Sequence, residues 1–246
     1  MAGNLLSCAT PQIPIQKREY KYIRDIVINN VASAGRHDPV YNSVVRVVNP
    51  QDRSIGTGFV FQNIRGNSYI FTAQHLCVRR GHKLEVATVP DKDNKIEKFF
   101  AKAVYTHKKD DVCIARVYDT GDRFLALPIA GDNPHRGDPV MILGASVGVF
   151  PTKTDGYVIG SDLLGLEQQT TRPPYFKKLL VSAASAGGNS GGPVYNEKFE
   201  VIGMLIARHP DFHHSSLCVH REALYYHIKK YFKKGLRRSP KRVRIK

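Results

Sequence analysis

Short apolar runs separated by polar breaks follow one another along most of the chain from residue 40 onward. In the first half these runs cover residues 43–48, 56–62, 68–73, 83–89, 100–107 and 111–118. In the second half they cover residues 141–146, 156–163, 177–183, 191–196 and 201–207. Many short strands at near-regular spacing, with Gly and Pro between them, predict an all-β barrel or sandwich. Strands do not alternate with long helices, which disfavours a doubly wound α/β sheet.

A connection rich in Pro, Gly and Asp near residues 122–138 divides the runs into two groups and predicts two small barrels side by side. Residues 16–33 have apolar side chains at helical spacing, which predicts a helix packed on the outside of the body, or alternatively a helix that binds a partner. Residues 221–234 predict a terminal helix. We therefore expect an arm and helix over 1–39, a β-barrel domain over 40–228 and a tail over 229–246.

Positive charge gathers at the end of the chain. The 246 residues carry a net charge of +16, yet residues 229–246 alone hold ten Lys or Arg and no acid, which leaves +6 on the rest. A mildly basic domain with a cationic tail describes this distribution better than a uniformly basic protein.

The first twenty residues lack the basic and apolar regions of a secretory signal, and no apolar run is long enough to span a membrane. The four cysteines, Cys8, Cys77, Cys113 and Cys218, are scattered without CxxC pairs, which disfavours a zinc site. We expect all four to be reduced and buried in an intracellular protein, either cytoplasmic or nuclear, with no metal and no cofactor.

The strongest chemical signal is the segment GGNSGGP at residues 187–193. A serine hydroxyl is a poor nucleophile at neutral pH and needs an adjacent base and N–H donors for the developing oxyanion. Glycines on both sides of Ser190 permit a tight turn that exposes the hydroxyl and those N–H groups. The segment therefore predicts a nucleophilic serine in place of an incidental one.

Two further segments extend this motif. His75 ends the run YIFTAQH, and Asp111 begins the run DVCIARV. The order His, Asp, Ser, with each residue at a strand edge, is one of the known chain orders of a catalytic triad. Asp110 is the alternative to Asp111, which we prefer because it begins the alternating strand.

These segments resemble the chymotrypsin/trypsin superfamily, and within it the Deg/HtrA-like branch and related viral processing proteases. The likeness rests on SVVRV, GTGFVF, YIFTAQH, DVCIARV, LGASVGVFPTKTDGYVIG and GNSGGPVYNEKFEVIGMLIA, which span roughly residues 43–207. It implies a double β-barrel serine endopeptidase that forms an acyl-enzyme in the cleft between the barrels. It also implies that Ser190 is the nucleophile, His75 the general base and Asp111 its orienting acid. The Gly188 and Ser190 amides would then form the oxyanion hole.

The resemblance further indicates which residues line the specificity pocket, namely Ala184, Ser185, Leu205, Ile206, Ala207 and Arg208. A pocket for Lys or Arg needs an acid where Ala184 stands. Preference for Gln or Glu needs a His where Leu205 stands, so we expect a small or medium neutral residue instead. The chain has no room for the PDZ domain of Deg/HtrA proteins, which favours a processing enzyme, with a viral polyprotein or precursor as one substrate.

The basic tail has three interpretations: nucleic-acid binding, a nuclear-import or anionic-membrane patch, and a solvated tail. The candidate nucleic-acid contacts are Lys233, Lys234, Arg237, Arg238, Lys241 and Arg242.

The alternative function for the whole chain is a packaging protein that binds nucleic acid and has a protease fold. An esterase or acyltransferase is a third, disfavoured because the GxSxG elbow is absent. The sequence predicts a polypeptide substrate and leaves the oligomeric state open.

Overall fold

The computed structural model describes residues 39–91, 93–161, 176–208 and 214–236. The first barrel contains six antiparallel strands: β1 (Val44–Val48), β2 (Ile55–Ile64), β3 (Asn67–Ala73), β4 (Lys83–Thr88), β5 (Lys98–His107) and β6 (Val112–Val117). They close in the order β1-β2-β3-β6-β5-β4. Every second residue points inward, so the core is filled by pairs such as Val45 with Val47 and Leu84 with Val86.

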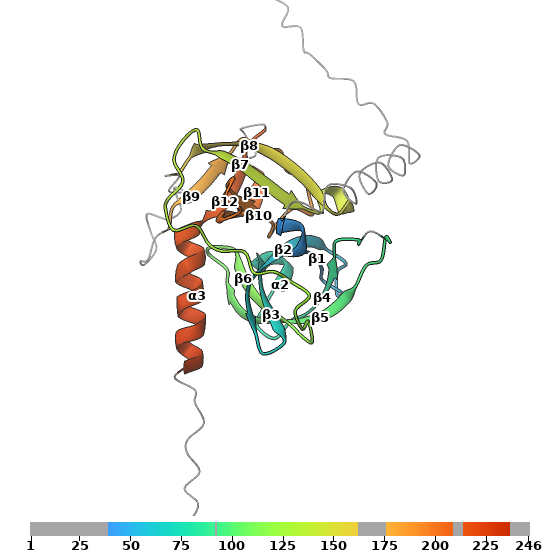
Figure 1. Ribbon diagram of the computed structural model, residues 1–246. Coiled ribbons are helices and arrows are strands. Elements are labelled where there is room, and N and C mark those ends of the chain that lie inside the picture. The colour runs from blue at the N-terminus through green and yellow to red at the C-terminus, as the bar shows by residue number, and fades with distance from the viewer. Residues whose placement is uncertain (1–38, 92, 162–175, 209–213, 237–246) are drawn as a thin grey trace, which may run out of the picture.

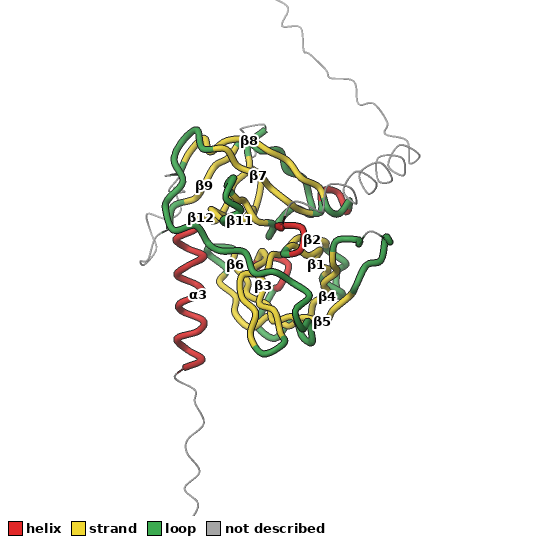
Figure 2. Tube along the Cα trace, in the orientation of Figure 1, coloured by secondary structure: helices red, strands yellow, loops and turns green. Residues whose placement is uncertain are grey.

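The second barrel contains six more strands: β7 (Pro139–Gly144), β8 (Thr152–Gly160), β9 (Lys178–Val181), β10 (Pro193–Tyr195), β11 (Val201–Arg208) and β12 (Ser216–His220). They close in the order β10-β11-β12-β9-β8-β7. The predicted all-β double barrel is therefore confirmed (Figures 1 and 2). β12 was missed by the sequence pattern, because its five residues lie between a histidine-rich stretch and the terminal helix.

The two barrels pack through a shared apolar layer. Phe59 and Phe71 of the first barrel belong to one buried cluster with Leu143, Tyr195 and Met204 of the second. Each such side chain contributes roughly 1.5–3 kcal/mol when it is fully buried. The residues between β6 and β7 bond to both barrels: the Leu127 amide donates to Val60 at 2.8 Å, and the Ala130 amide donates to Val201 at 2.9 Å. The barrels are thus held as one unit.

Helix α3 (Arg221–Leu236) begins directly after β12 of the second barrel and runs beside the first (Figure 1). Its residues Tyr231 and Phe232 pack against Tyr69 on β3, with ring centroids 6.0 and 5.7 Å away. The predicted terminal helix is present and continues past residue 229, where we had placed the start of the tail. Three shorter helical turns complete the described part: η1 (Pro39–Asn42), α2 (Gln74–Cys77) and η2 (Ser146–Gly148).

A disulfide corrects the expectation that all cysteines are reduced. Cys77 on α2 is bonded to Cys113 on β6, with Cα atoms 6.4 Å apart. The two cysteines are brought together because β6 pairs with β3, which places Thr72 opposite Cys113. The cysteines therefore no longer support an intracellular location. Cys218 is free and buried, and burial raises the pKa of its thiol.

Some predictions fall outside the described residues. The helix expected over 16–33, Cys8, and the tail residues Arg237, Arg238, Lys241 and Arg242 belong to this group. Lys233 and Lys234 lie within α3, although only their backbone is described. Within the described ranges, every helix is too short or too polar to cross a membrane.

Candidate active site

His75 lies on α2, the single helical turn that directly follows β3. The buried side chains of Leu76 and Cys77 anchor this turn, and the Gln74 amide donates to the Asp111 carbonyl at 3.1 Å. The His75 side chain is left 49% exposed. A rigid turn at the end of a barrel strand thus presents the imidazole to solvent.

Asp111 holds His75 through both carboxylate oxygens. Its Oδ2 lies 2.8 Å from His75 Nδ1, and its Oδ1 accepts the His75 backbone amide at 2.9 Å. Asp111 has a φ of 55°, a left-handed conformation that Asp tolerates better than most residues. The hydrogen bond to Asp111 raises the pKa of His75, while partial burial opposes this shift. The pair therefore favours an imidazole that accepts a proton on Nε2.

Asp110, the alternative orienting acid, points elsewhere. Its Oδ2 lies 2.8 Å from His227 Nε2 on α3 and 3.0 Å from His107 Nδ1. Burial alone would raise the pKa of Asp110, but the contacts with His107 and His227 lower it overall. The two neighbouring acids thus serve different partners, and Asp111 is the one at His75.

The loop that carries Ser190 is packed directly against the end of β3. The Ser190 carbonyl accepts the Thr57 amide at 2.8 Å, and the Gly191 amide donates to Leu205 at 2.7 Å. Gly191 has a φ of 88°, and a Cβ there would overlap the Thr57 carbonyl and crowd the Ala73 amide. Only glycine fits at this position, and the close approach brings Ser190 beside the turn that bears His75.

The Ser190 hydroxyl donates to the Ile206 carbonyl at 3.3 Å. Within the described part of the chain, it makes no hydrogen bond with His75. Nucleophile–base contacts are often long without substrate and tighten when substrate binds. Rotation about one side-chain bond would release the hydroxyl from Ile206.

Two backbone amides of this loop point to no described acceptor. The neighbouring amides of Asn189 and Gly192 donate to Ala186 at 3.1 Å and to Asn189 at 2.9 Å. The amides of Gly188 and Ser190 have no partner among the residues the structure describes. Gly188 has a φ of 98°, and a Cβ there would overlap the Ala145 carbonyl oxygen. The arrangement leaves two free donors on one tight turn.

Three side chains that were not predicted from the sequence fix this loop, namely Thr57, Ser146 and Asn189. The Thr57 hydroxyl donates to the Gly188 carbonyl at 2.7 Å and accepts the Ala145 amide at 3.0 Å. The Asn189 side chain is buried, and its Oδ1 accepts the Ser146 hydroxyl at 3.0 Å. These contacts join the loop to both barrels, and no local pattern marks residues so far apart in the chain.

The predicted pocket residues occupy two adjacent segments. The Ala184 carbonyl accepts the Thr154 hydroxyl, and the Ser185 hydroxyl accepts that of Ser216, each at 2.7 Å. On β11 a bulge separates Leu205, which pairs with Cys218, from Ala207, which pairs with Leu217.

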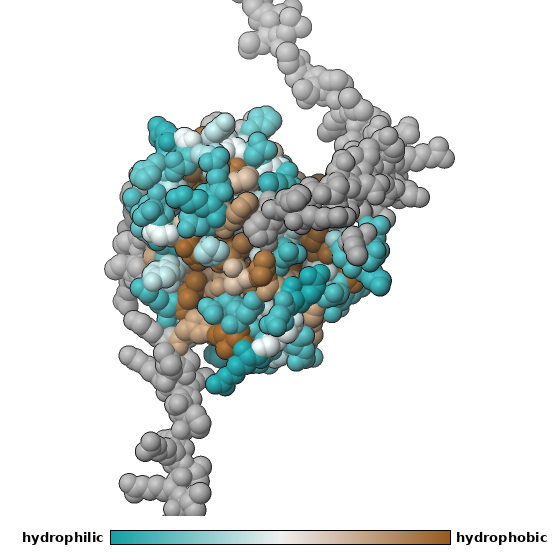
Figure 3. Space-filling model, in the orientation of Figure 1, coloured by the Kyte–Doolittle hydropathy of each residue, from teal (hydrophilic) through white to brown (hydrophobic). Residues whose placement is uncertain are grey.

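Side-chain exposure differs within this set. Leu205 is buried in the second barrel, Ile206 is half-buried, and Ala207 and Arg208 are exposed. Ser216 is a neighbour of Ser185 that the sequence reasoning did not include. Figure 3 shows apolar surface gathered along the line between the barrels on the face in view.

Comparison with known proteins supports the same family. The model of the trypsin-like peptidase domain matches residues 56–204. Rv3671c from M. tuberculosis H37Rv, in an inactive form, is 21% identical, with a TM-score of 0.66 over 84% of this chain and 93% of that one. The serine endoprotease from Yersinia pestis is 19% identical, with a TM-score of 0.64 over 91% of this chain and 69% of that one. A search of curated proteins found no match. The chain belongs to the trypsin-like peptidase domain family of serine endopeptidases.

Proposed function

We propose that the protein cleaves peptide bonds with Ser190 as nucleophile, His75 as general base and Asp111 as the residue that orients His75. The observation that carries this proposal is the two-point contact of Asp111 with the His75 ring and backbone, at 2.8 and 2.9 Å. This contact fixes the ring and leaves Nε2 as the proton acceptor. It also stabilises the imidazolium that forms when Ser190 gives up its proton.

In the first half-reaction, the Ser190 Oγ attacks the carbonyl carbon of the scissile bond while its proton passes to His75 Nε2. The resulting oxyanion accepts hydrogen bonds from the Gly188 and Ser190 amides, the two donors without a described partner. His75 then gives its proton to the leaving amine, and the acyl-enzyme remains. Water, activated by His75, releases the acid product and restores Ser190.

The composition of the predicted specificity pocket supports preference for a small or medium neutral residue before the cut. Its predicted lining includes Ala184 and the hydroxyls of Ser185 and Ser216, which bond to each other. Arg208 is the one charged side chain of the predicted set, so none of these residues offers a carboxylate to a substrate Lys or Arg. We further propose a role in processing a precursor, a viral polyprotein among the candidate substrates.

The cationic end of the chain supports a second, compatible function. Ten Lys or Arg without an acid in residues 229–246 favour association with nucleic acid or another anionic surface. This association would localise the protease, and it predicts binding that weakens as salt concentration rises. A shift assay with single-stranded RNA, for the full chain and for a chain ending at residue 236, tests it.

The protease function is tested by incubating the protein with a peptide library derived from a proteome. We expect new peptide ends to appear with the wild type and to be absent with Ser190→Ala. Their aligned sequences would give the residue preferred before the cut. An enzyme that cuts only after Lys or Arg would contradict the proposed pocket and leave the triad intact.

A further inference from the structure

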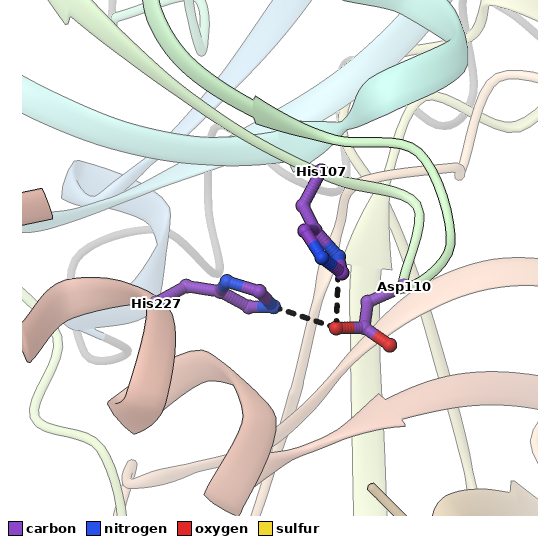
Figure 4. A group of neighbouring side chains, drawn as sticks. All are labelled: His107, Asp110 and His227. Carbon is purple, nitrogen blue, oxygen red and sulfur yellow. Dashed lines mark hydrogen bonds and ion pairs between the residues drawn. The ribbon is translucent and has the colours of Figure 1, made fainter. Parts of the chain in front are cut away.

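Three potential metal ligands converge at the turn beside Asp111 (Figure 4). His107 ends β5, Asp110 lies in the turn that follows, and His227 comes from the second turn of α3. One ligand atom from each lies within 4.8 Å of the other two. The cluster therefore joins the terminal helix to the turn that carries Asp111.

The donor set and its spacing suit a zinc-type ion. Zn²⁺ binds imidazole nitrogen and carboxylate oxygen at about 2.0–2.2 Å, which places tetrahedral ligand atoms about 3.3 Å apart. Asp110 Oδ2 lies 3.0 Å from His107 Nδ1 and 2.8 Å from His227 Nε2. An ion therefore requires these two contacts to lengthen by a few tenths of an ångström, and the imidazole nitrogens, which lie up to 4.8 Å apart, to move closer together.

His107 distinguishes this cluster from a network in which every contact is a well-aligned hydrogen bond. Its buried Nδ1 forms an ion pair with Asp110 Oδ2 at 3.0 Å, but the contact lies outside hydrogen-bond geometry. The ring is thus turned so that Nδ1 does not aim along the line to that oxygen. A ligand between the three side chains would satisfy this nitrogen.

The ring of His227 is held from its other side. Its Nδ1 lies 2.8 Å from the Tyr105 hydroxyl, which can accept a hydrogen bond from the Nδ1–H while Nε2 binds an ion. Outer hydrogen bonds of this kind orient histidine ligands and set their tautomer in metal sites. Asp110 and His227 are buried, whereas the His107 side chain is 31% exposed, which leaves access from solvent.

We propose that His107, Asp110 and His227 bind one divalent transition-metal ion, with Zn²⁺ as the best match to two imidazoles and a carboxylate. The ion would fasten α3 to the turn between β5 and β6. A cluster that only exchanges hydrogen bonds is the competing explanation.

The test measures Zn²⁺ uptake by protein stripped of metal with a chelator. Because the chain has ten histidines, the comparison between variants matters more than total uptake. His107→Gln removes a partly exposed ligand, and circular dichroism checks its fold. The matched control is His135→Gln, because His135 and Asp138 have the same spacing but lie 3.9 Å apart on the surface, and no third ligand joins them among the described residues.

We expect calorimetry to show one equivalent of Zn²⁺ bound by wild type and His135→Gln, with affinity at least about tenfold weaker in His107→Gln. Co²⁺ should give visible absorption bands that His107→Gln and His227→Gln both lose. Equal Zn²⁺ binding by wild type and His107→Gln would overturn the proposal. The absence of any binding by wild type would also overturn it, and the cluster would then be a hydrogen-bond network alone.

Discussion

Asp111 forms hydrogen bonds with both the ring and the backbone amide of His75, so the orientation of the imidazole is fixed at two points. The neighbouring Asp110 contacts His227 on α3 instead of His75. The two adjacent acids therefore have different roles: Asp111 lies in the proposed active site, and Asp110 lies at the contact with the terminal helix. This division lets the two acids be compared directly.

Replacing Asp111 with Asn should lower kcat on the order of 10⁴-fold, because the amide cannot hold the His75 tautomer that accepts the serine proton. Replacing Asp110 with Asn should instead cost roughly 1–3 kcal/mol of unfolding free energy through its buried contacts. Steady-state kinetics and urea unfolding of both variants separate these effects. An equal loss of kcat in folded Asp110→Asn would show that the roles are misassigned.

The acid limb of the pH–activity profile should report His75. Its hydrogen bond to Asp111 raises its pKa, so the midpoint of kcat/KM should lie above the ordinary value of 6.5. Activity should fall below that midpoint, since protonated His75 cannot accept the serine proton. In Asp111→Asn the midpoint should move down, because the main cause of the raised value is gone.

The raised pKa of His75 also determines how its contribution to stability changes with pH. A pKa raised by folding means that protonated His75 favours the folded state below its unfolded pKa, and that this contribution is lost as pH rises through the folded pKa. Proton NMR titration of the His75 ring in Ser190→Ala measures the folded pKa directly. A value at or below 6.5 would contradict the pairing with Asp111.

Two adjacent glycines test the proposed oxyanion hole. Gly188→Ala should lower kcat by about 10²–10³-fold, because its Cβ would overlap the Ala145 carbonyl and displace the amide donor. Gly187→Ala is the matched control, since a Cβ there meets nothing within 4 Å. Similar kinetics for the two variants would argue against a donor role for Gly188.

The Cys77–Cys113 disulfide closes a loop between residues 36 positions apart. The loop-entropy relation gives about 4 kcal/mol of stabilisation for that length, so Cys77→Ala with Cys113→Ala should lower the unfolding free energy by about this amount. Cys218→Ala is the control for loss of a buried thiol. Alkylation in denaturant should leave Cys77 and Cys113 unmodified until reductant is added, and their modification without reductant would contradict the bond.

Local patterns were enough to predict most of the fold and the residues of the candidate site. The strands are visible as short apolar runs between polar breaks. The motifs GGNSGGP, YIFTAQH and DVCIARV each lie within one short segment. The features that were missed depend on contacts between distant segments. Cys77 meets Cys113 only because β3 pairs with β6, and Asp110 meets His227 across 117 residues. Thr57 likewise fixes the Gly188 loop across 131 residues.

The most direct test of the account is labelling with a fluorophosphonate, followed by intact-mass measurement. Wild type should gain one adduct and Ser190→Ala none, while Ser54→Ala, a control in the turn between β1 and β2, should label like the wild type. Loss of the nucleophile in a triad of this kind lowers kcat by about a millionfold, so the contrast should be complete. A folded wild type that gains no adduct, or an adduct that persists in Ser190→Ala, would contradict Ser190 as the nucleophile.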